Sequence, residues 1–184
     1  FPKGKIDFAL HKGMEPKSLV VLAMNGKLKW KYEERLHFSL LDNILSIKLR
    51  QSMREDKSGV YGVGVSTSTE KFPDPEYDLQ VSFGCSPQNV DSLIEVVFLE
   101  MKKLQDEGPI QEDLVKVKET AINDREVAIE KNSYWINHLE NHYFRGDDII
   151  SMEEFKELVE SVTAKDIQKA AKRYFTMDAY VRAV

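Results

Sequence analysis

Arg54 and Tyr61 carry the most informative side chains of this sequence. They lie seven positions apart within the stretch Leu49-Arg-Gln-Ser-Met-Arg-Glu-Asp-Lys-Ser-Gly-Val-Tyr-Gly-Val-Gly-Val65. A guanidinium and a phenol are both hydrogen-bond donors, and neither is a nucleophile or a usual metal ligand at neutral pH. The pair is therefore suited to holding a carbonyl oxygen or an oxyanion, whereas the groups that would start a reaction are not evident.

The two residues are expected at a turn between a helix and a strand. Residues 33–54 have apolar side chains at helical spacing. The stripe consists of Leu36, Leu40, Ile44 and Ile47. Residues 59–69 are rich in β-branched side chains at a period near two, and their glycines are typical of a bulge or a close backbone approach. We therefore predict that the helix ends near Arg54 and that Tyr61 lies at the start of the next strand.

The remaining elements follow from the same patterns. Alternating or continuous apolar runs predict strands at residues 5–11, 18–24, 77–85 and 179–184, with Asn25-Gly26 ending the second. Ser86-Pro87 predicts a helix start, and residues 111–144 read as one long helix of ~50 Å with a kink near residues 131–133. Capping residues predict two short helices, after Ser151 and after Thr163. The order predicts an α+β fold in which a mostly antiparallel sheet has helices packed on one face.

Composition limits the classes of protein to which the chain could belong. Its 184 residues suit a single domain with a sizeable core. With 26 basic and 31 acidic residues the formal charge is −5, so we expect no nucleic-acid partner, and no apolar run approaches the ~18 residues of a membrane span. The chain begins with Phe-Pro and stops inside an apolar alternation at Val184. We therefore expect one domain, residues 1–184, that is cut at both ends from a larger protein.

Other reactive residues give weaker signals. His138 and His142 are one helical turn apart and could share a metal ion, but Glu140 lies on a different face and aromatic residues surround the pair. The glycines of residues 59–64 lack the order of a phosphate-binding loop. Cys85 is the single cysteine, so it forms no internal disulfide and is interpreted as structural. These observations predict no metal or nucleotide site in the chain.

Taken together, the motifs resemble those of a known family. They are the helix leading to Arg54, then Ser58-Gly59 and Tyr61, the alternating strand from Tyr77, the Ser-Pro helix start, Leu-Gln-Asp-Glu-Gly108, and the closing Thr163-Ala-Lys-Asp166 helix. In this order they resemble the C-terminal, non-zinc half of the pitrilysin/insulinase-type zinc peptidases (the inverzincins), relatives of the mitochondrial processing peptidases. The resemblance covers nearly the whole chain and implies the α/β sandwich of that family.

The resemblance implies that the two halves of the enzyme have different roles. In that family the first domain carries zinc on a His-x-x-Glu-His helix, and an arginine and a tyrosine of the opposite half face the metal. Those two residues would be Arg54 and Tyr61 here, holding peptide carbonyls and the oxyanion, with Tyr61 supporting catalysis. The chain contains neither His-x-x-Glu-His nor His-Glu-x-x-His. The implied protein is a zinc metalloendopeptidase whose zinc lies in a homologous N-terminal half, and this chain alone is predicted to be inactive towards its peptide substrate.

Two other interpretations remain open. The chain could be a non-catalytic scaffold or interaction subunit of the same fold, or an unrelated α+β domain in which Arg54 only ends a helix favourably and Tyr61 packs in the sheet. The location is open between the bacterial periplasm and the cytoplasm, and the relatives favour an exported protein.

Overall fold

The sheet is the framework on which the other elements rest. The computed structural model of the protein describes residues 3–55, 60 and 62–184, with the side chains of all of these except residues 54 and 55. Within that part of the chain, the strands form one five-stranded sheet in the order β1-β5-β2-β4-β3. They are β1 (Lys5–Phe8), β2 (Ser18–Lys27), β3 (Gly62–Glu70), β4 (Glu76–Cys85) and β5 (Tyr180–Ala183).

The sheet is mostly antiparallel, as predicted. β2 and β4 pair antiparallel from Ser18 opposite Cys85 to Lys27 opposite Glu76, while β1 and β5 pair in parallel. Alternate side chains of β2 and β4 are fully buried, as a strand with one covered face requires, and Leu22 and Leu79 are both 0% exposed.

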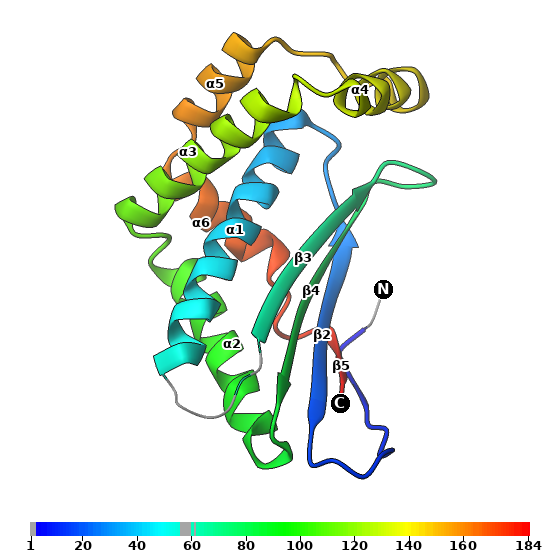
Figure 1. Ribbon diagram of the computed structural model, residues 1–184, viewed down its shortest axis with the longest axis vertical. Coiled ribbons are helices and arrows are strands. Elements are labelled where there is room, and N and C mark those ends of the chain that lie inside the picture. The colour runs from blue at the N-terminus through cyan, green and yellow to red at the C-terminus, as the bar shows by residue number, and fades with distance from the viewer. Residues whose placement is uncertain (1–2, 56–59, 61) are drawn as a thin grey trace.

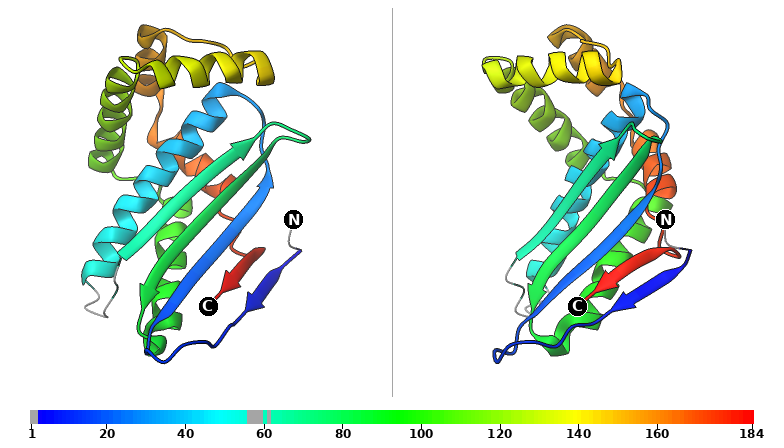
Figure 2. Two further views of the ribbon diagram at one scale, coloured as in Figure 1. Left: turned by 45° about the vertical axis from the view of Figure 1, so that its right-hand side comes forward. Right: turned by 90° about the vertical axis from the view of Figure 1, so that its right-hand side faces the viewer.

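The helices cover that buried face. They are α1 (Tyr32–Glu55), the 3₁₀ turn η1 (Pro87–Asn89), α2 (Val90–Asp106), α3 (Gln111–Ala128), α4 (Asn132–Arg145), α5 (Met152–Ser161) and α6 (Ala164–Tyr174). α1 lies against β3 and α6 against β2, while α2 and α3 pack on α1 (Figure 1). Figure 2 shows the helices behind the sheet, with no described helix on its other face. The predicted α+β class, with helices on one face, is therefore confirmed.

The prediction that β2 ends at Asn25-Gly26 is wrong. Both residues continue the strand, with Gly26 opposite Tyr77 in β4. A Cβ at Gly26 would lie 2.9 Å from a ring carbon of Tyr77. Glycine fits here because the Tyr77 ring occupies the place of a side chain at this position, so Gly26 does not mark a turn.

The helix predicted for residues 111–144 is two helices, and they are separated close to the kink predicted near residues 131–133. α3 ends at Ala128 and α4 begins at Asn132, and Figure 1 shows α4 turned across the end of the molecule. Lys131 has an extended backbone, and the Trp135 indole donates a hydrogen bond to the Ile129 carbonyl at 2.8 Å, which holds the corner. The apolar residues of α4 keep helical spacing although none of them is buried, so the periodicity predicted one helix with a kink where the structure has two separate helices.

The predicted helix starts differ in outcome. Ser86 precedes only the 3₁₀ turn, its hydroxyl makes no capping bond, and α2 begins at Val90. The capping residues of the two short helices are confirmed. The Ser151 hydroxyl accepts from the Glu154 amide, and Thr163 forms the equivalent capping box that opens α6.

Candidate functional site

The candidate site lies around the C-terminal half of α1. Arg54 belongs to the last turn of this helix, but its side chain lies outside the described part of the chain, and so do Ser58-Gly59 and Tyr61. The predicted Arg54–Tyr61 pair therefore stays a prediction. What the structure describes is the helix that carries residue 54 and the groups that fix it.

The last turns of α1 are held against α2 by a buried carboxylate. The Ser52 hydroxyl donates to Glu100 Oε1 at 3.0 Å, and Lys103 Nζ lies 2.7 Å from the same oxygen. Glu100 is only 5% exposed, so its charge depends on these two partners. This arrangement fixes the backbone of the turn that leads to residue 54.

A second ion pair fixes α1 against α3. Lys48 Nζ lies 2.5 Å from Asp113 Oδ2, and both side chains are largely buried. Because a mostly desolvated charge pair has a narrow range of favourable geometries, it sets how the two helices cross.

The other end of α1 is held by Asp147, which follows α4. Asp147 Oδ1 accepts hydrogen bonds from Trp30 Nε1 at 2.7 Å and from Arg35 Nη1 at 2.9 Å. The Arg35 guanidinium stacks over the Trp30 ring at 4.1 Å. We call Trp30, Arg35 and Asp147 the Asp147 latch, because together they tie the start of α1 to the segment after α4.

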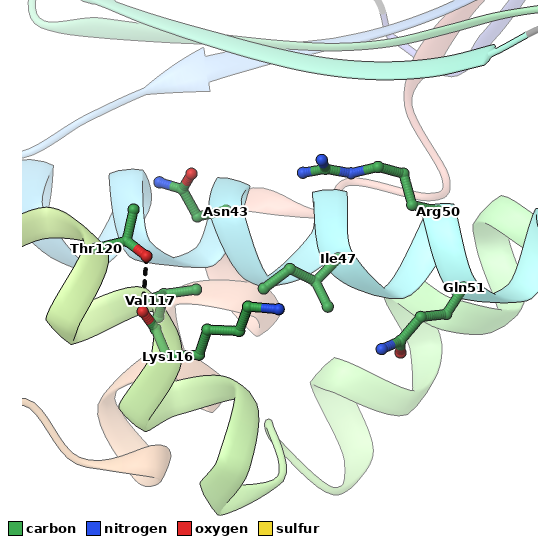
Figure 3. Close-up of a pocket in the computed structure, with 7 residues that line it drawn as sticks. All are labelled: Asn43, Ile47, Arg50, Gln51, Lys116, Val117 and Thr120. Carbon is green, nitrogen blue, oxygen red and sulfur yellow. Dashed lines mark hydrogen bonds between the residues drawn. The ribbon is translucent and has the colours of Figure 1, made fainter. Parts of the chain in front are cut away.

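Between α1 and α3 lies a cavity of about 320 Å³, which we call the α1–α3 groove. Its lining residues are Asn43, Ile47, Arg50, Gln51, Lys116, Val117 and Thr120. Ile47 and Val117 supply the apolar part of the lining. Figure 3 shows Asn43 and Arg50 on one side of Ile47 and Lys116 on the other. The Cα of residue 54 lies two helical turns beyond that of Ile47, ~10.5 Å further along α1.

The α1–α3 groove is electropositive. Arg50 Nε donates to the Ser46 carbonyl at 3.0 Å, which leaves its two terminal amines available. In the described part of the chain, neither these amines nor the Lys116 ammonium has a hydrogen-bond or ion-pair partner. None of the described residues that line the groove is acidic. An arrangement of this kind attracts carboxylates and peptide carbonyl oxygens.

Asp42 lies on the other side of α1, at the contact with β3. The Thr67 hydroxyl donates to Asp42 Oδ2 at 3.2 Å, while Oδ1 is buried and has no hydrogen-bond partner among the described groups. Burial raises the pKa of this carboxyl, and the bond from Thr67 only partly offsets that effect. Asp42 therefore does not contribute to the groove, although the neighbouring Asn43 does.

The two histidines that could share a metal are engaged elsewhere. His138 Nδ1 lies 3.1 Å from the Tyr134 carbonyl and its ring stacks on Tyr134, while His142 Nδ1 lies 2.7 Å from the Asp147 carbonyl. Burial lowers the pKa of His138. Among the described residues, no three His, Cys, Asp or Glu side chains are grouped so that they could hold a metal ion. His138 and His142 therefore have no third such ligand beside them in the described part of the chain.

Cys85, at the end of β4, is fully buried. Burial raises the pKa of its thiol, which keeps it protonated and unreactive at neutral pH. The structural interpretation of Cys85 therefore agrees with its surroundings.

Sequence reasoning missed Asn43, Arg50 and Lys116. The sequence shows that these residues are polar or basic, but it does not show that they are neighbours. Only the packing of α3 on α1 brings residues 43–51 and 116–120 together to form the groove. None of the described helices is long and apolar enough to cross a membrane.

Comparison with known proteins gives three sequence matches. The family model described as "Peptidase M16 inactive domain" matches residues 2–121. The chain is 28% identical over 116 residues to "Zinc protease PQQL-like" of Arabidopsis thaliana, a match that covers 60% of this chain and 12% of that protein. It is 28% identical over 106 residues to "Probable zinc protease PqqL" of Haemophilus influenzae, covering 56% of this chain and 11% of that protein. The chain thus spans a small part of the relatives that it matches.

Solved structures show the same fold. The periplasmic protease PqqL from Escherichia coli superposes with a TM-score of 0.83 at 18% identity, over 98% of this chain and 20% of that one. A peptidase M16 inactive domain from Pseudomonas fluorescens superposes with a TM-score of 0.77 at 17% identity, over 98% of this chain and 42% of that one. The structure of the first half of E. coli PqqL also matches, with a TM-score of 0.74 at 12% identity, over 98% of this chain and 41% of that half.

Proposed function

Because the chain belongs to the peptidase M16 inactive-domain family, we propose that it is the substrate-binding C-terminal domain of a larger zinc metalloendopeptidase. Residues 1–184 are one domain, and it works with a homologous zinc-bearing N-terminal half. The observation that carries the proposal is the electropositive α1–α3 groove, which leads along α1 towards residue 54.

In this proposal Arg54 and Tyr61 hold the reacting peptide. The Arg54 guanidinium offers a forked set of donors to a peptide carbonyl or a terminal carboxylate. The Tyr61 phenol donates to the carbonyl oxygen that gains negative charge as the peptide bond is attacked. Donors placed at that oxygen stabilise the transition state more than the ground state, so they raise kcat as well as binding. The zinc and the groups that activate water belong to the partner half.

The fixed position of α1 supports this role. Its C-terminal turns are held by Glu100 and its crossing with α3 by Asp113, so residue 54 stands on a rigid element. Donors that act on a transition state need this rigidity, because a displacement of about 1 Å can cost ~100-fold in rate. We also propose an exported location, which is supported by E. coli PqqL being a periplasmic protease.

The test is the peptide-hydrolysis kcat/KM of the parent protein with Arg54→Ala and with Tyr61→Phe. Each variant is expected to lose ~100- to 1,000-fold in kcat/KM, the usual effect of removing one oxyanion donor, with an unchanged Tm. Matched controls are Lys172→Ala and Tyr143→Phe, which change exposed residues that do not line the groove. Full activity in both Arg54→Ala and Tyr61→Phe would show that these two residues do not hold the reacting peptide, and it would favour a scaffold role.

A further inference from the structure

We propose that the α1–α3 groove is a subsite for acidic peptide segments, in which a side-chain carboxylate lies between Arg50 and Lys116 above Ile47. The proposal rests on the proposed function, because it assigns a class of substrate to the same wall of the enzyme. It adds two cations, Arg50 and Lys116, to the expected donors Arg54 and Tyr61.

The shape of the groove suits a short piece of extended peptide. Its volume of about 320 Å³ is at the lower end of the ~300–1,000 Å³ typical of ligand sites, so it holds one or two residues. Ile47 and Val117 provide an apolar surface for the methylene groups of a glutamate side chain. Asn43 and Thr120 are exposed polar residues in the lining. Asn43 Nδ2 donates to the Ser39 carbonyl and the Thr120 hydroxyl to the Lys116 carbonyl, so each side chain offers an oxygen that can accept from a peptide N–H.

The charges decide which side chain is preferred. The protein carries a net charge of −5, yet the described residues that line the groove include two cations and no acid. The buried acid at the start of α3, Asp113, is already paired with Lys48. The bond from Arg50 Nε to the Ser46 carbonyl holds the guanidinium along α1, and its terminal amines have no partner among the described residues. A carboxylate that binds here meets a forked donor on one side and an ammonium on the other (Figure 3).

The test compares peptides that differ in one charge. Two fluorescein-labelled peptides of identical sequence except for a central Glu or Gln are titrated with the 184-residue chain, and binding is followed by anisotropy. At low salt the Glu peptide is expected to bind about threefold to tenfold more tightly, since exposed ion pairs contribute modestly. The preference should shrink as the salt concentration rises towards 1 M.

Variants of the groove give the sharper result. The double variant Arg50→Gln with Lys116→Gln should bind both peptides equally. The double variant Arg50→Glu with Lys116→Glu should prefer a matched Lys peptide instead. Lys172→Gln, an exposed lysine of α6, is the control and should keep the preference for Glu. All of the substituted side chains are exposed, so each variant is expected to fold. A thermal unfolding curve of each variant checks this.

The outcomes separate this proposal from the proposed function. Equal binding of the Glu and Gln peptides, no binding of the Glu peptide up to millimolar protein, or a preference that survives in the double Gln variant would each overturn the subsite. If the subsite fails while Arg54→Ala and Tyr61→Phe still lower kcat/KM of the parent protein, the proposed function stands. If the chain prefers the Glu peptide but Arg54→Ala and Tyr61→Phe keep full activity, the groove is a peptide-binding site and the proposed catalytic role of Arg54 and Tyr61 is wrong.

Discussion

The Asp147 latch should contribute measurably to stability because it holds the start of α1. Asp147→Ala removes the carboxylate that accepts from Trp30 at 2.7 Å and from Arg35 at 2.9 Å. The Arg35 and Asp147 side chains are each 18% exposed, so the arginine would lose its charged partner in a largely desolvated place. A hydrogen bond to a charged group contributes about 1.5–3 kcal/mol when buried and less when water can replace it. We expect a loss of about 2 kcal/mol in the free energy of unfolding, and about half of that for Asp147→Asn.

Urea unfolding followed by circular dichroism measures this loss, and a thermal scan should show Tm lowered by roughly 4–8 °C for a chain of this size. Asp148→Ala is the matched control, because Asp148 is the exposed neighbour and no hydrogen bond or ion pair holds it in the described structure. If Asp147→Ala and Asp148→Ala unfold at the same urea concentration, the Asp147 latch does not stabilise the fold.

Further predictions concern the pH dependence of stability and the exposed apolar surface of α4. Burial raises the pKa of Asp42 above 3.8 in the folded protein, so the folded state favours the protonated carboxyl. The free energy of unfolding that this preference adds at low pH is lost as pH rises through the raised value. Asp42→Asn should therefore raise the free energy of unfolding at pH 7, and urea unfolding that shows no gain would contradict this. Hydrogen bonds from Thr163 hold the pKa of Asp166 at about 2. Its contribution of about 1 kcal/mol, typical of a helix cap, should be lost as pH falls from 3.8 towards 2, and Asp166→Ala should remove that pH dependence. On α4, Ile136 and Tyr143 are 63% and 84% exposed. Replacing both with serine should change stability by less than about 1 kcal/mol but lower self-association in sedimentation experiments, and a large loss of Tm would show that α4 is packed after all.

Local signals in the sequence predicted most of the framework. The stripe of apolar residues in α1 and the alternation in β4 follow directly from burying one face of each element. The helix caps at Ser151 and Thr163 could be predicted from the sequence, because all the residues of a capping box lie within four positions of one another.

What the sequence did not reveal depends on distant contacts. The kink near residues 131–133 was predicted, but the contact that ties the segment after α4 to the start of α1 was not, since Asp147 and Trp30 are 117 positions apart. Gly26 was misread as a turn because the ring that requires it belongs to Tyr77, on another strand. The α1–α3 groove was missed for the same reason, since Arg50 and Lys116 meet only through helix packing. The roles of Arg54 and Tyr61 came from the family resemblance, and they remain predictions.

We propose that this chain supplies the substrate-holding wall of a peptidase whose zinc lies in another domain. The most direct test is reconstitution, in which the zinc-bearing half of the parent protein and this chain are prepared separately and then mixed with a fluorogenic peptide. We predict that neither half hydrolyses the peptide alone, that the mixture does, and that a mixture made with the Arg54→Ala, Tyr61→Phe chain regains little activity. A zinc-bearing half that is fully active alone, or equal activity with the doubly substituted chain, would contradict the account.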